Sequence, residues 1–394
     1  MSGPRILFLN QVAGPLFREL AEDVASALGS AELLTGHTAD IVRPLNAALT
    51  VLPAPDYDRR SLPRRAFSWL RYFATACRKV AVSDSRQVLF IVSNPPFLPL
   101  LGWFAWVMRR QRYCVLVYDL YPGVLVRLGQ ISDRGPVAVL WRWFNRLVWA
   151  RAALVFTIGE DLAANIRREG VGLKNLEVRV VPNWADVDLV KPLSAAQNPF
   201  RQSLGWAGRT IVLYSGNLGN THNLDGLLQA AEKLRNRSDL GFLIIGAGAR
   251  WSELESAIAT RRLDNVRLLP FQPERLLPQT LPAGDIAVVA MEEALGGYMV
   301  PSKTYYYLAA GSALLALVPA QCEVADLIAR EDCGIRVDAA DAAAAVAAIE
   351  RLLDDPERLA ACRRRAREVA VRNYSRRNST HYIEALRTLL GNLT

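Results

Sequence analysis

The sequence predicts an α/β protein with two Rossmann-like domains, each a parallel sheet with helices around it. Short apolar runs rich in β-formers alternate with longer helical stretches along the chain, which is typical of βαβ units. A chain of 394 residues is too long for one ordinary core and suits two domains. The alternation is interrupted near Pro182–Pro199, where Pro, Asn and Asp occur without periodicity. We therefore expect a first domain at 1–184, a linker at 185–199, a second domain at 200–372, and at 373–394 a helix that can cross back to the first domain.

The predicted strands are short and apolar. In the first half they are Arg5–Leu9, Ala31–Thr35, Ala48–Leu52, Val88–Ser93, Cys114–Tyr118, Leu154–Ile158 and Val178–Val181. In the second half they are Ile211–Tyr214, Gly241–Ile245, Val266–Pro270, Ile286–Ala290, Ala313–Leu317 and Gly334–Val337. The expected helices include Leu224–Leu234, Arg250–Thr260, Ala342–Leu353, and a last one around Tyr382–Leu390. The basic stretch Arg363–Arg367 is expected to form a solvated helix face.

The charge of the chain is uneven. Residues 1–184 hold 23 Lys and Arg against 14 Asp and Glu, whereas residues 185–394 hold 24 of each kind. Tryptophan and arginine mixed in one region suit an anionic membrane surface. Nucleic acid would attract the same charge, but we find no nucleic-acid motif and expect no such partner. The predicted membrane contacts are Trp103, Trp106, Arg109, Arg110, Trp141 and Trp143.

Two apolar stretches in this basic half remain open to two interpretations. The run Phe97–Met108 has 12 residues, fewer than the roughly 20 needed to span a bilayer. It is either a partly buried helix of the first domain or a helix at the membrane interface. Val137–Ala150 is a second amphipathic stretch of the same basic and aromatic kind, and it favours the interfacial interpretation.

The numbers and spacing of cysteine and histidine limit the kinds of site that the sequence can form. The five cysteines are scattered without a CxxC pair, and there are three histidines, so we expect neither a disulfide framework nor a metal site. No Ser-His-Asp, Cys-His or HExxH arrangement is visible. The N-terminus reads as a first strand without a leader, so we expect a cytoplasmic location.

Two glycine turns in the second half could approach a phosphate. Gly216 and Gly219 follow a strand and precede a helix, whose first N–H groups suit a diphosphate. The same turn could be purely structural. Gly246 and Gly248 resemble the start of a dinucleotide fingerprint, but Trp251 stands at the third glycine position, so we expect no NAD site.

The stretch GGYMVPSKTYYYLAAG is the most specific of the second half. It offers the Ser302 hydroxyl and the Lys303 ammonium at the start of a helix, with Pro301 suited to the first turn. A cation there could neutralise the charge that develops on a departing diphosphate. The alternative is a surface lysine on an ordinary helix.

In the first half, the carboxylate of Asp119 follows a strand directly. Open α/β sheets bind ligands at this edge, so Asp119 could hold an acceptor hydroxyl or accept its proton. It could equally be a turn residue that bonds the backbone before Pro122.

With these residues in order, the chain is similar to family 4 of the retaining glycosyltransferases. It is most similar to the branch used in O-antigen, colanic acid and capsule assembly, which includes N-acetyl-L-fucosamine transferases. The resemblance runs nearly end to end, and its specificity lies in the ordered combination. The motifs are RILFLN, AELLTG, SNPPFLPLLG, YDLYPGVLVRLG, VRVVPNWADVDLVKP, YSGNLG, IIGAG, NVRLLPF, DIAVVAM, VPSKTYYYLAAG and DDPERLAACRRRAREVAVRNYS.

The resemblance implies a GT-B fold, with the donor nucleotide held by the second domain and the acceptor by the first. It implies no metal and no cofactor, because the nucleotide sugar, most commonly of uridine diphosphate, is a substrate. Asp119 and Lys303 are then the catalytic candidates. The donor-side residues would be Gly216, Asn217, Gly219, His222, Gly246, Glu293, Ser302, Lys303, Thr304, Tyr306 and Glu323. The acceptor side would hold Gly14, Asn94 and Asp119.

The chain also departs from the family pattern. Asn217 and His222 stand where an Arg and a Lys are common, which leaves Lys303 as the main cation. Tyr298 and Tyr306 stand where a pair of Glu residues is usual. Tyr118 replaces a His before Asp119, and Gly123 replaces a Glu after it.

These observations predict transfer of a sugar from a nucleotide diphosphate to a lipid-linked or growing surface-glycan acceptor. The reaction would retain configuration, with the protein attached peripherally to the inner face of the plasma membrane. Two alternatives stay open. One is a nucleotide-sugar 2-epimerase of the same architecture. The other is a non-catalytic partner subunit, which the replaced Arg, Lys and Glu positions favour.

Overall fold

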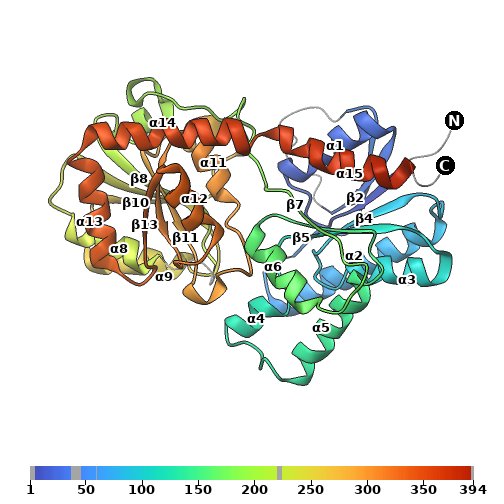
Figure 1. Cartoon of the computed structure of the whole chain (residues 1–394). Helices are drawn as coiled ribbons and strands as arrows, with labels where there is room; N and C mark the ends of the chain where they lie inside the picture. The colour runs from blue at the N-terminus through green and yellow to red at the C-terminus, as the bar shows by residue number, and fades with distance from the viewer. Residues whose placement is uncertain (1–4, 37–45, 59, 220–223, 392–394) are drawn as a thin grey trace. The chain divides into compact units, whose positions relative to one another are not determined.

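The computed structural model describes residues 5–36, 46–58, 60–219 and 224–391. The chain divides into two compact units, which we describe separately (Figure 1). Unit 1 comprises Met1–Pro182 with Arg376–Thr394, and unit 2 comprises Asn183–Ser375. The helix expected at 373–394 therefore belongs to unit 1.

Unit 1 is built on a parallel sheet of seven strands in the order β3-β2-β1-β4-β5-β6-β7. The strands are β1 (Ile6–Leu9), β2 (Ala31–Thr35), β3 (Leu49–Pro53), β4 (Val88–Val92), β5 (Tyr113–Val117), β6 (Leu154–Thr157) and β7 (Val178–Val180). Its helices are α1 (Pro15–Leu28), α2 (Leu62–Val82), α3 (Pro99–Arg109), α4 (Gly123–Arg127), α5 (Pro136–Trp149), α6 (Glu160–Glu169) and α15 (Ser379–Gly391), with the short turn η4 (Arg376–Asn378).

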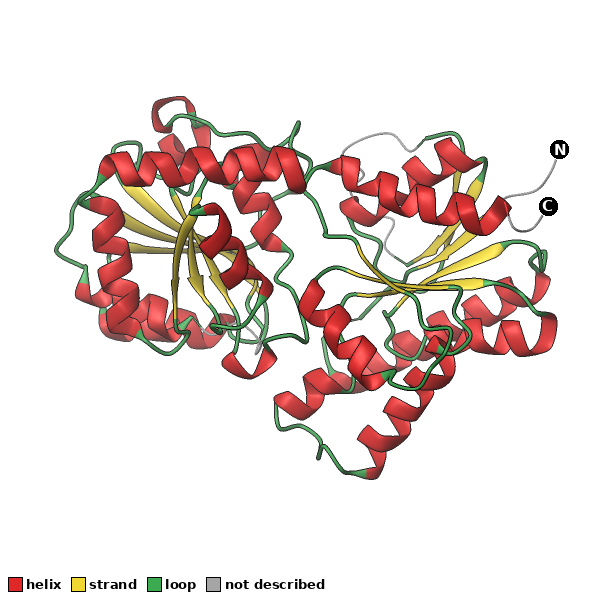
Figure 2. Cartoon of the chain, viewed as in Figure 1, coloured by secondary structure: helices red, strands yellow, loops and turns green. Residues whose placement is uncertain are grey.

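Helices cover both faces of this sheet, with α1 and α15 together on one of them (Figure 2). Three strand phenylalanines point to this face. Phe8 makes an edge contact with Phe17 of α1, and Phe90 and Phe156 pack against Tyr382 of α15. Arg376 fixes the start of this terminal segment by two hydrogen bonds to Asp23, 2.7 and 3.0 Å long. Aromatic burial and this ion pair therefore attach the terminal helix to unit 1.

The opposite face of the sheet carries α3 and α5, which pack against each other (Figure 1). Gly102 lets α3 approach the strands closely, because a Cβ atom there would lie 2.6 Å from the ring of Tyr113. The Phe97–Met108 run is thus a helix packed on the sheet along one side.

Unit 2 holds a parallel sheet of six strands in the order β10-β9-β8-β11-β12-β13. The strands are β8 (Thr210–Asn217), β9 (Leu240–Ala247), β10 (Val266–Leu269), β11 (Ile286–Ala290), β12 (Ala313–Leu317) and β13 (Gly334–Val337). The α-helices are α7 (Pro199–Ser203), α8 (Asp225–Lys233), α9 (Trp251–Arg261), α10 (Leu277–Thr280), α11 (Lys303–Ala309), α12 (Glu323–Glu331), α13 (Ala342–Leu353) and α14 (Pro356–Asn373). The 3-10 turns are η1 (Ala195–Gln197), η2 (Glu274–Leu276) and η3 (Glu293–Leu295).

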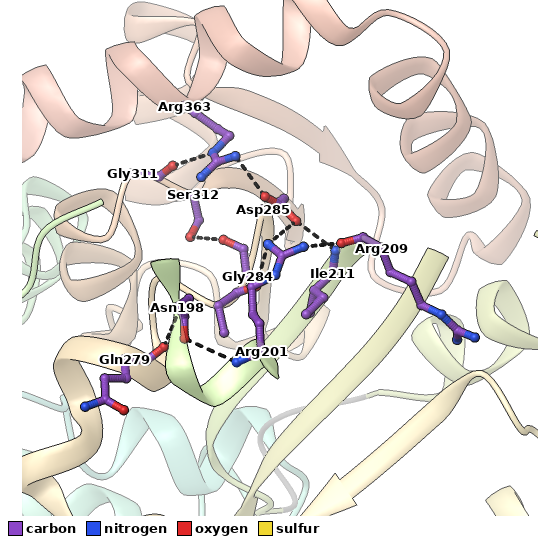
Figure 3. Close-up of polar contacts among 11 residues, drawn as sticks. Asn198, Arg201, Arg209, Ile211, Gln279, Gly284, Asp285, Gly311, Ser312 and Arg363 are labelled. Carbon is purple, nitrogen blue, oxygen red and sulfur yellow. Dashed lines mark hydrogen bonds and ion pairs between the residues drawn. The ribbon is translucent and has the colours of Figure 1, made fainter. Parts of the chain in front are cut away.

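The amino-terminal edge of the unit 2 sheet is tied by a buried ionic network around Asp285 (Figure 3). Its carboxylate accepts hydrogen bonds from Arg201 at 2.9 Å, from Arg363 at 2.8 Å and from the Ile211 backbone N–H at 2.9 Å. Arg201 and the carboxylate are withdrawn from water, Arg363 is half-buried, and each bond is charge-assisted. The network joins β8, α7 and α14 at the start of β11.

The predicted strands agree with the structure, since all thirteen lie where the sequence places them. The strands β8 and β9 run farther than expected, to Asn217 and Ala247, so the glycine turns begin inside the ladder.

The expectation of a solvated face for Arg363–Arg367 is wrong for its two end residues. Besides bonding Asp285, Arg363 donates to the Gly311 carbonyl, and Arg367 donates to the carbonyls of Val187, Val190 and Ala309. Residues four apart lie on the same side of a helix, so this side of α14 faces the unit. Arg364 and Arg365 are exposed, as expected.

Among the described residues, no helix combines the length and apolar character required to cross a membrane.

Candidate functional site

Each sheet has one point where the strand order reverses direction. It lies between β1 and β4 in unit 1, and between β8 and β11 in unit 2. Ligands of open α/β sheets bind outside the carboxyl ends of the strands at such points. Gly14 and Asn94 follow β1 and β4, whereas Gly216 lies at the carboxyl end of β8 and Lys303 follows β11.

The glycines of unit 2 are required where the ends of β8 and β9 meet. Gly216 pairs with Gly246 in the ladder, and a Cβ atom on Gly246 would lie 2.1 Å from the Gly216 carbonyl oxygen. A Cβ atom on Gly248 would lie 2.4 Å from the Leu218 carbonyl oxygen. The close approach of the two backbones explains Gly246 and Gly248 without a ligand.

Gly216 has a different neighbour, the side chain of Lys303. A Cβ atom on Gly216 would lie 2.9 Å from Nζ of Lys303, so the glycine leaves the space that the ammonium occupies. The Lys303 ammonium donates a 2.6 Å hydrogen bond to the Tyr214 hydroxyl and lies 3.9 Å from the centre of that ring. The Tyr214 hydroxyl in turn donates to the Asn217 carbonyl at 2.7 Å. The structure thus brings Gly216, Asn217 and Lys303 together.

Burial perturbs the titration of this lysine. It lowers the pKa of Lys303 to about 7, because the ammonium loses much of its hydration. Hydrogen bonding to a tyrosine and contact with its ring only partly replace water. No carboxylate among the described residues forms an ion pair with Lys303. An incoming anion would therefore find a cation whose charge the protein has not neutralised.

Helix α11 is itself held against β8 by a second tyrosine. The Tyr307 hydroxyl accepts a 2.7 Å bond from the Ser215 N–H and donates a 2.9 Å bond to the Ser215 carbonyl. Four residues separate Lys303 and Tyr307, so both project from one side of α11 towards the end of β8. Tyr307 therefore positions the helix that carries the lysine.

The remaining donor-side candidates differ in how far they are buried. Ser302 precedes α11 and is exposed, whereas Thr304 is buried, and its hydroxyl has no hydrogen-bond partner within the described chain. Tyr306 is half-buried on α11. Glu323 begins α12 and is half-buried, and Glu293 is exposed in η3.

Protein contacts involve the described residues on both sides of the turn after β8, and its expected phosphate role stays a prediction. A Cβ atom on Gly219 would lie 2.6 Å from Nδ2 of Asn217. Helix α8 begins at Asp225, whose carboxylate pairs with Arg250 at 2.9 Å. A carboxylate in the first turn competes with an anion for the helix terminus. His222 lies outside the described residues.

In unit 1, Asp119 follows β5 and is half-buried. Burial raises its pKa to about 6, because desolvation disfavours the carboxylate. None of the described residues donates a hydrogen bond to its side chain, so the expected alternative, a turn carboxylate that bonds the backbone, is not seen. Burial and, to a smaller extent, the negative charge of Asp119 raise the pKa of the neighbouring Tyr121 to about 12.

The two other acceptor-side candidates are half-buried loop residues. Gly14 is the N-cap of α1, and a Cβ atom there would meet nothing within 4 Å, so the structure gives no steric reason for glycine. Asn94 lies between β4 and α3.

The sequence argument missed Tyr214, Tyr307 and Tyr121, which contact or adjoin the two charged candidates. Tyr214 lies in an apolar strand, Tyr307 in a helix and Tyr121 in a turn, and these places predict only core packing.

Several of the predicted membrane residues contact other residues of unit 1. Arg109 donates to the carbonyls of Val80, Ala81 and Ser83 at the end of α2. The guanidinium groups of Arg110 and Arg151 both lie over the ring of Trp106, 4.3 and 4.5 Å from its centre. The side chains of Arg109 and Trp106 thus already have protein partners, and their expected lipid role stays a prediction.

The other three tryptophans differ in exposure. Trp103 is half-buried against Phe104, and Trp141 stacks on Tyr121 with 5.8 Å between ring centres. Trp143 alone among the predicted tryptophans is exposed. Around it, α3 and α5 present further apolar side chains to solvent, and we call this set with Trp143 the apolar surface: Phe104, Val107, Met108, Val137, Val139 and Leu140.

Within the described chain, no group of three or more His, Cys, Asp and Glu side chains is arranged to hold a metal ion.

Both units match known protein families. Residues 13–184 match the family described as glycosyl transferase 4-like domain, and residues 196–369 match glycosyl transferases group 1. Among curated proteins, the chain is 26% identical over 249 residues to WbjE of Pseudomonas aeruginosa, described as a probable glycosyltransferase. It is 30% identical over 195 residues to WcaI of Escherichia coli strain K12, whose description names colanic acid biosynthesis. These matches cover 63% and 49% of this chain, and 60% and 47% of the relatives' own length.

Solved structures share the fold over nearly the whole chain. Sucrose-phosphate synthase from Thermosynechococcus elongatus has a TM-score of 0.77 at 18% identity, covering 99% of this chain and 100% of that one. HepE from Anabaena, solved with UDP-glucose, has a TM-score of 0.73 at 15% identity, covering 97% and 99%. The expected GT-B fold is confirmed. The chain therefore has a GT-B fold, in which a region that matches the glycosyl transferase 4-like domain is followed by one that matches glycosyl transferases group 1.

Proposed function

We propose that this protein is a retaining, metal-independent glycosyltransferase. It would move a sugar from a nucleoside diphosphate, uridine diphosphate being the first candidate, to a lipid-linked or growing surface-glycan acceptor. The observation that carries the proposal is Lys303, an ammonium without a carboxylate partner among the described residues, at the carboxyl edge of the unit 2 sheet. Such a cation suits the diphosphate leaving group.

The relatives support the class of donor and of product. The structure of HepE contains UDP-glucose, and a trehalose-phosphate synthase from Burkholderia vietnamiensis with the same fold is described as UDP-forming. The description of WcaI names colanic acid biosynthesis. That of WaaG, another protein of this fold, names lipopolysaccharide biosynthesis. A surface glycan is therefore the product class that we infer.

In the proposed reaction, the bond between the sugar C1 and the donor phosphate oxygen breaks with its electron pair on the phosphate. The acceptor hydroxyl oxygen bonds to C1 from the same face, and its proton passes to the departing phosphate or to Asp119. Lys303 stabilises the negative charge on the diphosphate. Asp119, with its pKa of about 6, is largely ionised at neutral pH and can hold the hydroxyl.

We also propose that unit 1 docks peripherally on the inner face of the plasma membrane through the apolar surface. Its exposed side chains lie beside the basic α2, and unit 1 carries the excess of positive charge. Flotation with anionic vesicles should recover the protein at low salt, and less of it at higher ionic strength. Recovery should fall after Trp143→Ala with Met108→Ser. Equal flotation of this variant and wild type would contradict the docking.

The decisive assay offers the purified chain labelled nucleotide sugars with and without a lipid-linked acceptor fraction. We expect label in the lipid fraction, with the donor's anomeric configuration preserved by NMR. An inverted product would contradict retention. Epimerised donor in the absence of acceptor would assign the 2-epimerase activity instead. If the protein bound none of the nucleoside diphosphates, the proposal would be overturned.

A further inference from the structure

An apolar cavity of about 260 Å³ lies between α3 and α5 in unit 1. Phe97 and Leu100 line one side, and Leu140, Trp141 and Phe144 line the other. Leu140 is 52% exposed, so the cavity opens at the apolar surface. A hydrocarbon chain inserted there would be removed from contact with water along its length. The free energy gained is proportional to the apolar area that is buried.

The cavity offers little to a polar ligand. Its one amide side chain, Asn145, donates a 2.7 Å hydrogen bond from Nδ2 to the Tyr121 carbonyl. The remaining lining side chains are aliphatic, aromatic or proline. The occupant that fits this chemistry is therefore hydrocarbon.

Polar donors without partners lie next to the cavity, on α2. The Nε of Arg65 and the Nε1 of Trp69 are both buried, and neither has a hydrogen-bond partner within the described residues. Four residues apart, the two side chains leave the same side of α2. Buried N–H groups are nearly always satisfied, so two in one place indicate a missing acceptor. A guanidinium and an indole offer only donors, and a phosphate offers only acceptors at neutral pH.

Two aromatic contacts connect these donors to the cavity. Trp69 makes an edge contact with Phe97 of the lining, with ring centres 6.2 Å apart. On the other side, lining residue Trp141 stacks on Tyr121, which follows Asp119 by two residues in the chain. The unpaired donors, the hydrocarbon cavity and the Asp119 carboxylate are thus neighbours within unit 1.

We propose that this arrangement binds the acceptor's own lipid, a hydrocarbon chain that enters the α3–α5 cavity and carries a phosphate bonded by Arg65 and Trp69. The inference rests on the proposed function, because it specifies the class of acceptor. The sugar attached to that phosphate then lies beside Asp119. The enzyme recognises the lipid directly, and the membrane alone does not select the acceptor.

The test uses the full chain and three probes: farnesyl phosphate, farnesol and inorganic phosphate. Leu140→Glu places a charge at the cavity mouth, and Val139→Glu is its control, equally exposed on α5 but outside the lining. Arg65→Gln removes the guanidinium, and Arg78→Gln is its control at an exposed position farther along α2. Binding is measured by calorimetry below the micelle concentration of the lipid.

We expect wild type and both controls to bind farnesyl phosphate about tenfold or more tightly than farnesol or inorganic phosphate. Leu140→Glu should weaken both lipids about tenfold, whereas Arg65→Gln should weaken farnesyl phosphate and leave farnesol unchanged. Equal loss in Val139→Glu and Leu140→Glu would mean general surface contact and would overturn the cavity. Equal loss in Arg65→Gln and Arg78→Gln would overturn the phosphate contact.

A soluble acceptor separates this inference from the proposed function. Transfer to a lipid-free glycoside should be the same in wild type and Leu140→Glu, while transfer to the lipid-linked acceptor falls. If both substrates are used equally by both proteins, the lipid site is wrong and the transferase proposal stands. Phosphatidic acid vesicles that displace farnesyl phosphate completely would show that the cavity takes membrane acyl chains, which overturns the acceptor assignment.

Discussion

Asp285 and Asp119 are both carboxylates at the end of a buried strand, but their surroundings are opposite. Asp285 precedes β11 in unit 2, and its side chain is 10% exposed between Arg201 and Arg363. Asp119 follows β5 in unit 1, and no described residue bonds its side chain. The amino-terminal edge of the unit 2 sheet therefore satisfies its buried charge within the protein, whereas the carboxyl-terminal edge of the unit 1 sheet leaves its own for a ligand.

The same contrast separates the cations of unit 2. Arg201 and Arg363 complete the Asp285 network, and they hold the strands in place (Figure 3). Lys303, at the other edge of the sheet, contacts the hydroxyl and ring of Tyr214 and pairs with no carboxylate of the described residues. Paired charges in this protein serve the fold, and we assign the unpaired ones to substrates.

The largest effect should come from Asp119→Asn, which removes the acceptor-side charge and leaves its shape. We expect turnover with acceptor to fall ~10²–10⁴-fold, because a general base or positioning carboxylate is lost. Nucleotide affinity should stay within twofold, since the donor candidates belong to unit 2. Asp133→Asn, at an exposed carboxylate of unit 1, is the control. Turnover per folded molecule equal to wild type would remove Asp119 from the site.

Asp285→Asn should act on stability instead. It leaves Arg201, 3% exposed, without its full countercharge, and breaking such a buried pair costs about 3–5 kcal/mol of unfolding free energy. Asp239→Asn breaks an exposed pair with Arg237 and should cost at most about 1 kcal/mol. Denaturant titration measures both. Similar losses in the two variants would show that the Asp285 network is not a structural anchor.

The smallest effect is a pH-dependent gain in stability in Asp119→Asn. The folded-state pKa of Asp119 is about 6, above the ordinary value of 3.8, so its ionisation weakens the fold progressively as pH rises from about 4 to 6. Well above pH 6 the penalty is complete, and the variant should be about 3 kcal/mol more stable than wild type, as a shift of roughly two pKa units requires. Below pH 4 the two should coincide. A difference in free energy of unfolding that is constant with pH would contradict the unpaired carboxylate.

Sequence patterns predicted the fold better than the site. Alternating β-rich runs and helices located every strand, because buried parallel strands need continuous apolar segments whatever their neighbours. The patterns did not predict that Arg363 and Arg367 face inward, since their partners Asp285 and Val187 are distant in sequence. The role of Tyr214 beside Lys303 was hidden for the same reason. The motif resemblance identified the lysine, and only the tertiary structure shows what it touches.

Lys303 tests the central claim most directly, because its ammonium is the unpaired cation proposed for the diphosphate. Calorimetry of uridine diphosphate binding at pH 8, in two buffers of different ionisation enthalpy, counts the protons taken up. A lysine with a pKa of about 7 is mostly neutral at this pH and should gain a proton when the anion raises its pKa. We expect uptake of up to one proton by wild type, none by Lys303→Ala, and a fall in turnover on the order of 10²-fold or more in that variant. Equal uptake and turnover within twofold in the two proteins would contradict the account.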